Sequence, residues 1–121
     1  MNFDFSDDQK LLKDQARKFL TDKCGAKVVR RILDTDELYA KEVWKGIVEL
    51  GWTGTAIPEA YGGIGLGYLE LCMIAEELGR SLAPVPFSSS VYLATEALLL
   101  AGSEEQKQKY LPAMAAGEMI G

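Results

Sequence analysis

The feature that most restricts the fold of this chain is a pair of helix-start motifs, one near each end. In both, a serine is followed three residues later by a glutamine, in Ser6-Asp7-Asp8-Gln9 and in Ser103-Glu104-Glu105-Gln106. In such a capping box the serine hydroxyl accepts a hydrogen bond from the backbone amide three residues on, and the glutamine side chain accepts one from the serine amide. The carboxylates between them face the positive end of the helix dipole. The motifs therefore predict a helix beginning at each place.

Between these motifs, apolar residues recur with the spacing of helices. Gly51 suits the left-handed position that ends a helix, so the third helix is expected to end there. The segment 87–101 is apolar or small around most of its circumference, which predicts a helix buried on several sides. Pro112 has no amide to donate, so a break is expected there, with a fresh turn over 112–116. The expected helical segments are 6–25, 28–33, 36–51, 68–79, 87–101 and the stretch from 103 to the break.

The expected architecture is all-α, a bundle of five to six helices forming one domain over residues 1–121. Hydrophobic residues make up 48% of the chain and charged residues 26%, which suits a single core. The net charge of −5 argues against binding to a nucleic-acid backbone. The most apolar run, 91–101, is short and carries Glu96, so no membrane span is expected. The first residues lack a cationic start and an apolar core, so we expect no signal peptide and a cytoplasmic protein.

The residue types that the chain lacks limit its chemistry. It has no histidine, which excludes a Ser-His-Asp triad, a Cys-His dyad and a histidine-based metal site within these residues. Cys24 and Cys72 do not form a C-x-x-C motif, and we expect two free thiols in a reducing compartment. Glu76 and Glu77 are neighbours that point about 100° apart on a helix, so they cannot converge on one substrate atom. We expect one of them to form a salt bridge between helices.

A glycine cluster, Gly62-Gly63-Ile64-Gly65-Leu66-Gly67, invites a nucleotide-binding interpretation. The G-x-G-x-x-G spacing fails, because Tyr68 stands where the last glycine would be required, and no strand precedes the cluster. A structural loop with several positive-φ positions is favoured. The nearby run Ser88-Ser89-Ser90 has no base to activate a hydroxyl, so it is expected to cap or pack. The alternative is that it lines a small-molecule cavity.

Five short motifs occur in order over residues 5–121. They resemble the N-terminal helical domain of the acyl-CoA dehydrogenase family, and the segment Pro84-x-Pro86-Phe87 looks most like bacterial members. The motifs are Leu50-Gly51-Trp52, Ile57-Pro58-Glu59-x-Tyr61-Gly62-Gly63-x-Gly65, Glu76-Glu77-Leu78-Gly79-Arg80, Gly102-Ser103-Glu104-Glu105-Gln106-Lys107 with Lys109-Tyr110-Leu111-Pro112, and Gly117-Glu118.

The resemblance implies a three-domain flavoprotein that removes the α and β hydrogens of an acyl-CoA and passes a hydride to FAD. The match stops where the first strand of the middle β domain is expected, so the flavin-holding domain and the catalytic glutamate are expected outside this chain. Alone, the chain is expected to be inactive, to bind FAD weakly or not at all, and to self-associate through an uncovered apolar face. The implied partners are the acyl-CoA substrate, the remaining domains of the full-length chain, and further subunits of a homo- or hetero-oligomer.

The resemblance implies that this domain forms the floor of the acyl pocket. Residues 85–92 resemble the stretch that bounds the acyl tail, where small serines could admit a bulky or branched group. Core packing explains Phe87 and Tyr92 equally well. The candidate substrate-binding residues are Val85, Phe87, Ser88, Ser89 and Tyr92.

Two other interpretations remain open. One is a related flavoenzyme on the same fold, such as an acyl-CoA oxidase or a flavin monooxygenase, or a non-catalytic subunit of a mixed complex. The other is a free-standing helical interaction module that keeps the scaffold without the chemistry.

Overall fold

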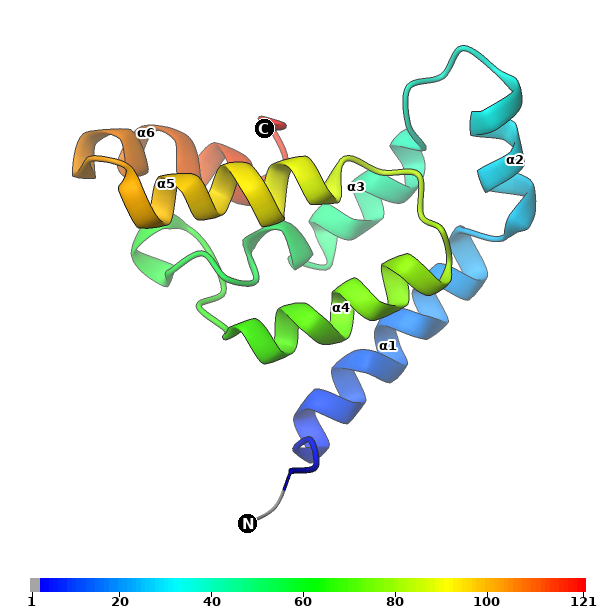
Figure 1. Cartoon of the computed structure of the whole chain (residues 1–121), viewed down its shortest axis with the longest axis horizontal. Helices are drawn as coiled ribbons and strands as arrows, with labels where there is room; N and C mark the ends of the chain where they lie inside the picture. The colour runs from blue at the N-terminus through cyan, green and yellow to red at the C-terminus, as the bar shows by residue number, and fades with distance from the viewer. Residues whose placement is uncertain (1–2) are drawn as a thin grey trace. The chain divides into compact units, whose positions relative to one another are not determined.

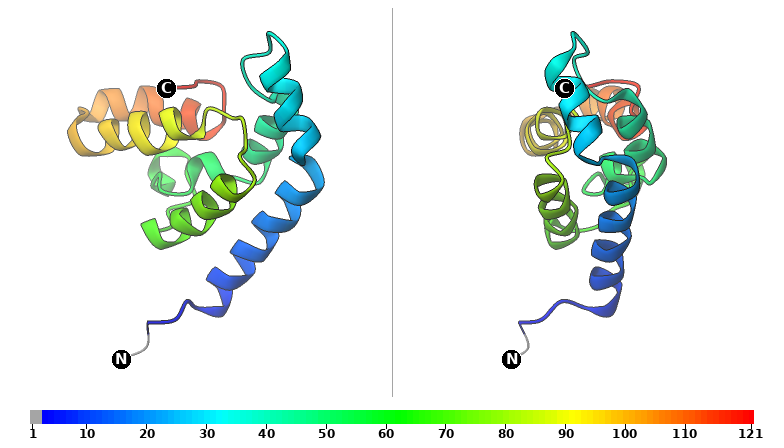
Figure 2. Two further views of the ribbon diagram at one scale, coloured as in Figure 1. Left: turned by 45° about the vertical axis from the view of Figure 1, so that its right-hand side comes forward. Right: turned by 90° about the vertical axis from the view of Figure 1, so that its right-hand side faces the viewer.

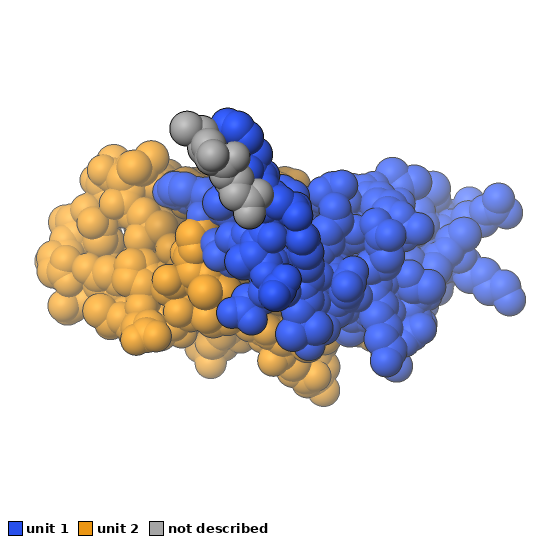
Figure 3. All heavy atoms as spheres, turned by 90° about the horizontal axis from the view of Figure 1, so that it is seen from below, with its two compact units in different colours: residues 1–40, 68–84 blue, residues 41–67, 85–121 orange. Residues whose placement is uncertain are grey.

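The computed structural model describes residues 3–121, which are helical with no strand among them (Figure 1), so the all-α prediction is confirmed. Two compact units are present (Figure 3): a first unit of residues 1–40 and 68–84, and a second unit of residues 41–67 and 85–121. The α-helices are α1 (Asp7–Lys23), α2 (Ala26–Asp34), α3 (Lys41–Glu49), α4 (Tyr68–Arg80), α5 (Glu96–Ala101) and α6 (Glu104–Ala115). The shorter elements are the 3-10 turns η1 (Trp52–Gly54) and η2 (Glu59–Tyr61) and the π-helical segment η3 (Ser88–Thr95).

In the first unit, α1 and α4 lie side by side (Figure 2). The predicted capping box opens α1: the Gln9 amide donates to Ser6 Oγ (3.2 Å), and the Ser6 amide donates to Gln9 Oε1 (3.0 Å). The helix ends at Lys23, two residues before the expected Gly25, which is extended and precedes α2. The two helices bury Ala16 and Leu20 from α1, and Leu71, Met73, Ile74 and Leu78 from α4.

Helix α2 also belongs to the first unit, and none of its residues is buried. Helix α3 was expected from Asp36, but it begins at Lys41, so that boundary was wrong. The reason is local, because polar contacts hold the intervening residues in a non-helical path. Thr35 Oγ1 donates to the Arg31 carbonyl (2.7 Å), and the Ala40 amide donates to the Pro84 carbonyl (2.9 Å).

In the second unit, α6 packs against η1 and η2 and lies beside α5 (Figure 2). Its capping box at Ser103 is present as predicted. The predicted break at Pro112 was wrong, because α6 continues to Ala115. Leu111 and Met114, on either side of the proline, are both buried, and their packing keeps the last turn helical despite the lost amide donor.

The helix over 87–101 is buried on one side only, which corrects the prediction of burial on several sides. Phe87, Val91 and Thr95 are buried, whereas Leu93 and Leu100 are 68% and 80% exposed. Packing against α6 and η1 covers one side of this helix and leaves Leu93 and Leu100 in solvent. Within residues 3–121, no helix has the length and apolar character needed to cross a bilayer.

Candidate functional site

The glycine cluster after η2 uses its backbone amides internally. Gly62 and Gly65 have φ values of +83° and +73°, as the structural-loop interpretation predicts. Four successive amides donate to backbone carbonyls, so they do not point at a shared anion. The cluster therefore offers no cradle for the diphosphate of FAD. The four donors and their acceptors are Gly63 to Pro58 (3.2 Å), Ile64 to Gly54 (2.9 Å), Gly65 to Ile57 (2.9 Å) and Leu66 to Thr55 (2.8 Å).

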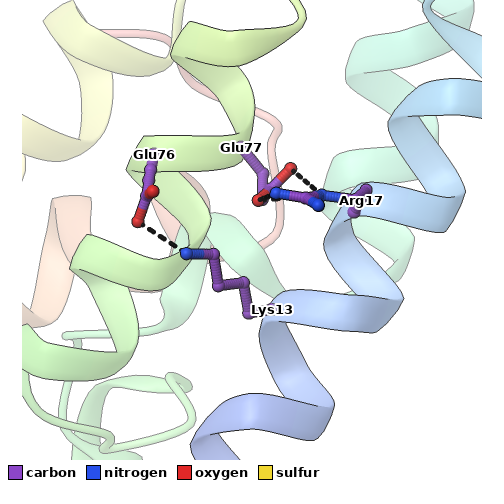
Figure 4. A network of polar contacts seen from close by, with 4 residues as sticks. All are labelled: Lys13, Arg17, Glu76 and Glu77. Carbon is purple, nitrogen blue, oxygen red and sulfur yellow. Dashed lines mark hydrogen bonds and ion pairs between the residues drawn. The ribbon is translucent and has the colours of Figure 1, made fainter. Parts of the chain in front are cut away.

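Glu76 and Glu77 both form ion pairs across the α1–α4 interface, which confirms the predicted salt bridge (Figure 4). Lys13 Nζ lies 2.9 Å from Glu76 Oε2, in a solvent-exposed pair. The guanidinium of Arg17 holds the Glu77 carboxylate with two nitrogens, Nη2 to Oε1 at 2.9 Å and Nε to Oε2 at 3.1 Å. The Glu77 side chain is fully buried, whereas Arg17 is half exposed.

The ion pair fixes the charge of both groups. Hydrogen bonds from Arg17 lower the pKa of the Glu77 carboxyl from its ordinary value, against the opposing effect of burial. The same contact raises the pKa of Arg17. A general base needs a pKa near the working pH. Glu77 is therefore a structural anion rather than a candidate base.

Of the predicted acyl-binding residues, Val85 lies just before Pro86, and the other four lie in the first turns of the helix that follows it. Phe87 is buried and meets the ring of Tyr92 edge-on, with ring centroids 5.4 Å apart. Val85 and Tyr92 are half-buried, and Ser88 and Ser89 are exposed. The structure therefore brings Phe87 and Tyr92 together and leaves the two serines facing solvent.

A π-helical register explains the contact between the two rings. Residues five apart share a face in a π-helix, and they do not in an α-helix. The same register places Thr95 Oγ1 2.7 Å from the Ser90 carbonyl, to which it donates. Apolar periodicity assumes an α-helix and missed this feature. The only sequence signal is the density of serine and threonine, whose hydroxyls compete for backbone partners.

Two of the cavities in the described residues lie elsewhere. The larger, of about 600 Å³, is an open groove in the first unit between the end of α1, helix α2 and the turn after α4. The smaller, of about 380 Å³, is lined by Pro58, Glu59, Gly65 and neighbouring residues of the second unit. None of the predicted acyl-binding residues lines either one. No cluster of three or more metal-ligating side chains occurs within residues 3–121.

Comparison with known proteins assigns the fold to a family. The family model described as "Acyl-CoA dehydrogenase, N-terminal domain" matches residues 6–118. The mitochondrial isovaleryl-CoA dehydrogenase of Pongo abelii is 36% identical over 118 residues, which cover 96% of this chain and 28% of that protein.

Solved structures support the same family assignment. An acyl-CoA dehydrogenase from Bacillus anthracis, complexed with FAD, is similar with a TM-score of 0.87 and 30% identity, over 97% of this chain and 20% of that one. The ChsE4–ChsE5 complex of Mycobacterium tuberculosis gives a TM-score of 0.89 and 29% identity, over 99% of this chain and 33% of that one. The chain thus spans less than a third of the length of the isovaleryl-CoA dehydrogenase relative. Because the family model matches residues 6–118, the chain belongs to the acyl-CoA dehydrogenase family and corresponds to its N-terminal helical domain.

Proposed function

We propose that this chain is the N-terminal domain of an FAD-dependent acyl-CoA dehydrogenase, which oxidises an acyl-CoA thioester between its α and β carbons. The family match over residues 6–118 carries this proposal. Because the chain spans 28% of its isovaleryl-CoA dehydrogenase relative, flavin binding and proton abstraction are assigned to the rest of the full-length protein. The internal pairing of the glycine-cluster amides supports placing the flavin outside these residues.

The role proposed for this domain is to form the floor of the acyl pocket with residues 85–92. The edge-on contact of Phe87 with Tyr92 would hold the segment in place. The exposed Ser88 and Ser89 would then leave room for a bulky or branched acyl group. The isovaleryl group named in several relatives is branched, which agrees with this chemistry. In this role, residues 85–92 exclude water from around the acyl tail and determine which tail shapes fit the pocket.

Kinetics of the full-length protein test this role. Replacing Ser89 by leucine should fill the space beside the tail and lower kcat/KM for isovaleryl-CoA by about ten-fold, because extra methylene groups in a pocket change discrimination by about 10–200-fold. Butyryl-CoA, whose tail has the same main-chain length but lacks the methyl branch, should be less affected. Ala97→Leu is the matched control, because Ala97 is also exposed on the same helix but lies outside 85–92.

The outcomes separate the two parts of the proposal. Unchanged discrimination in Ser89→Leu would remove residues 85–92 from the acyl pocket while leaving the dehydrogenase assignment intact. A full-length protein that carries no flavin, or that oxidises no acyl-CoA, would overturn the dehydrogenase assignment. Release of hydrogen peroxide with acyl-CoA as substrate would indicate an oxidase instead.

The 121-residue chain alone should show no acyl-CoA oxidation and no stoichiometric flavin absorbance. It should also self-associate, because Leu93 and Leu100 expose a large apolar surface along one helix face. Light scattering across a concentration series checks the second expectation. A monomer at every concentration would show that this face needs no cover.

A further inference from the structure

The groove in the first unit is separate from the residues assigned to the acyl pocket. Its apolar walls come from Leu20 near the end of α1, Val29 and Leu33 on α2, and Leu82 in the turn after α4. Its volume of about 600 Å³ lies within the range of roughly 300–1,000 Å³ that is typical of small-molecule sites. Every lining residue belongs to one unit, so the groove is a property of that unit alone.

The charged side chains that line the groove are all positive. Arg30 on α2 and Arg80 at the end of α4 both line it, and no Asp or Glu does. This is unexpected in a chain of net charge −5. Arg80 lies close enough to Glu77 to lower the pKa of that carboxyl, but the hydrogen bonds of Glu77 come from Arg17. The groove therefore combines apolar walls with two guanidinium groups, and a ligand that carries a negative charge would complement it.

Two further observations indicate that the apolar side chains of the groove are kept exposed to contact a ligand. Helix α2 places Val28, Val29, Ile32 and Leu33 along one side, yet buries none of them. Leu82 has a φ of +51°, in the left-handed region where a residue with a β-carbon is disfavoured and glycine is usual. Its side chain is nevertheless 71% exposed and lines the groove.

We propose that this groove binds an amphiphilic anion: a single acyl chain that lies along Val29, Leu33 and Leu82, with its carboxylate held by Arg30 and Arg80. The volume suits one flexible tail, and the planar guanidinium groups suit a carboxylate. This site is distinct from the proposed pocket floor at residues 85–92 and does not depend on the dehydrogenase assignment. Its ligand is the free acid rather than the thioester.

Displacement of a polarity-sensitive fluorescent fatty acid from the 121-residue chain tests the proposal. Decanoate should displace the probe. Decanol, with the same tail length and no charge, and butyrate, with the charge and a short tail, should each compete at least about ten-fold less well. Arg30→Gln and Arg80→Gln should each weaken decanoate binding by about ten-fold, since each removes a charge-assisted hydrogen bond. Circular dichroism verifies that the variants remain folded.

Arg31→Gln is the matched control, because Arg31 is the next cation on the same helix and does not line the groove. It should bind decanoate like the parent. Methyl chemical shifts of Leu33 and Leu82 should move on titration with decanoate. Equal binding of decanol and decanoate, or an equal loss in Arg31→Gln, would overturn the proposal in favour of non-specific adsorption. Groove shifts induced by an acidic amphipathic peptide but not by decanoate would also overturn it, in favour of a protein partner.

Discussion

The two units of this domain are stabilised in different ways. In the first unit, α1 and α4 are joined by long side chains, with Arg17 bridging to the buried Glu77 and Lys13 to the exposed Glu76. In the second unit, the glycine cluster folds back so closely that its amides donate to the backbone of residues 54–58. Side chains therefore join the elements of the first unit, and the absence of side chains allows the second unit to close.

The contrast predicts how each unit responds to substitution. A long side chain at an interface can reorient and keep part of its contact, so its loss is graded. A backbone-to-backbone approach leaves no such freedom, and one added carbon atom forces main-chain movement. The largest effects are therefore expected at glycines of the second unit.

Gly63→Ala should have the largest effect. A β-carbon at this position would overlap the carbonyl oxygen of Ile57, which is backbone and cannot swing away. We expect the free energy of unfolding to fall by about 4 kcal/mol, as measured by urea denaturation at neutral pH. The matched control is Gly79→Ala in α4, where a β-carbon would meet nothing within 4 Å. That variant should gain about 0.5–1 kcal/mol from helix propensity. Similar losses in the two variants would contradict the contrast.

Arg17→Gln should have the next largest effect, because it leaves the fully buried Glu77 carboxylate without its cation. Thermal unfolding at pH 7 should show a fall in Tm of roughly 5 °C, moderated because Arg17 is itself half in water. Lys13→Gln is the control in the adjacent exposed pair, and its Tm should change by less than about 2 °C. If both changed Tm equally, burial of Glu77 would have no special importance for the first unit.

The pH dependence of stability should follow from the same pair. Because the folded-state pKa of Glu77 lies below its ordinary value of 4.5, this carboxyl stabilises the folded state above that pH, and the contribution is lost as the pH falls through the folded-state pKa. Urea denaturation between pH 7 and pH 3 should therefore show a loss of stability at acidic pH. Glu77→Gln, which does not titrate, should lose less over the same range. An identical pH profile for the parent and this variant would show that other carboxyls cause the acid loss.

The features predicted from sequence are those that a few neighbouring residues determine. Both capping boxes form because the serine and the glutamine need only each other. Gly51 has the left-handed φ of +81° that its place after α3 predicted. These outcomes depend little on tertiary context. Helix geometry likewise showed that Glu76 and Glu77 cannot converge on one atom, but their partners Lys13 and Arg17 lie on α1, about sixty residues away, and were not predicted.

The features that were missed depend on contacts distant in the sequence. Pro112 breaks no helix because buried neighbours hold the turn. The π-helical register of η3 places Phe87 against Tyr92, which an α-helical pattern cannot predict. The groove brings Arg30 and Arg80 to one surface, although fifty residues of chain separate them. Helix propensity by itself does not determine any of these placements.

Leu82→Gly should produce the smallest effect and sharpens the contrast between the units. The second unit uses glycine at left-handed positions, as at Gly51 and Gly62. The first unit instead has Leu82 in a left-handed conformation, with a φ of +51°. Because Leu82 is 71% exposed, glycine should gain about 1 kcal/mol of stability from relief of backbone strain and lose little packing. Leu82→Ala is the control, since it removes the same side chain and keeps the β-carbon, so it should not show that gain. A loss of stability in both variants would mean that the Leu82 side chain stabilises the folded unit, and the strain would then be explained by packing. A gain in the glycine variant alone, measured by urea denaturation, would leave contact with a ligand in the groove as the reason for the leucine.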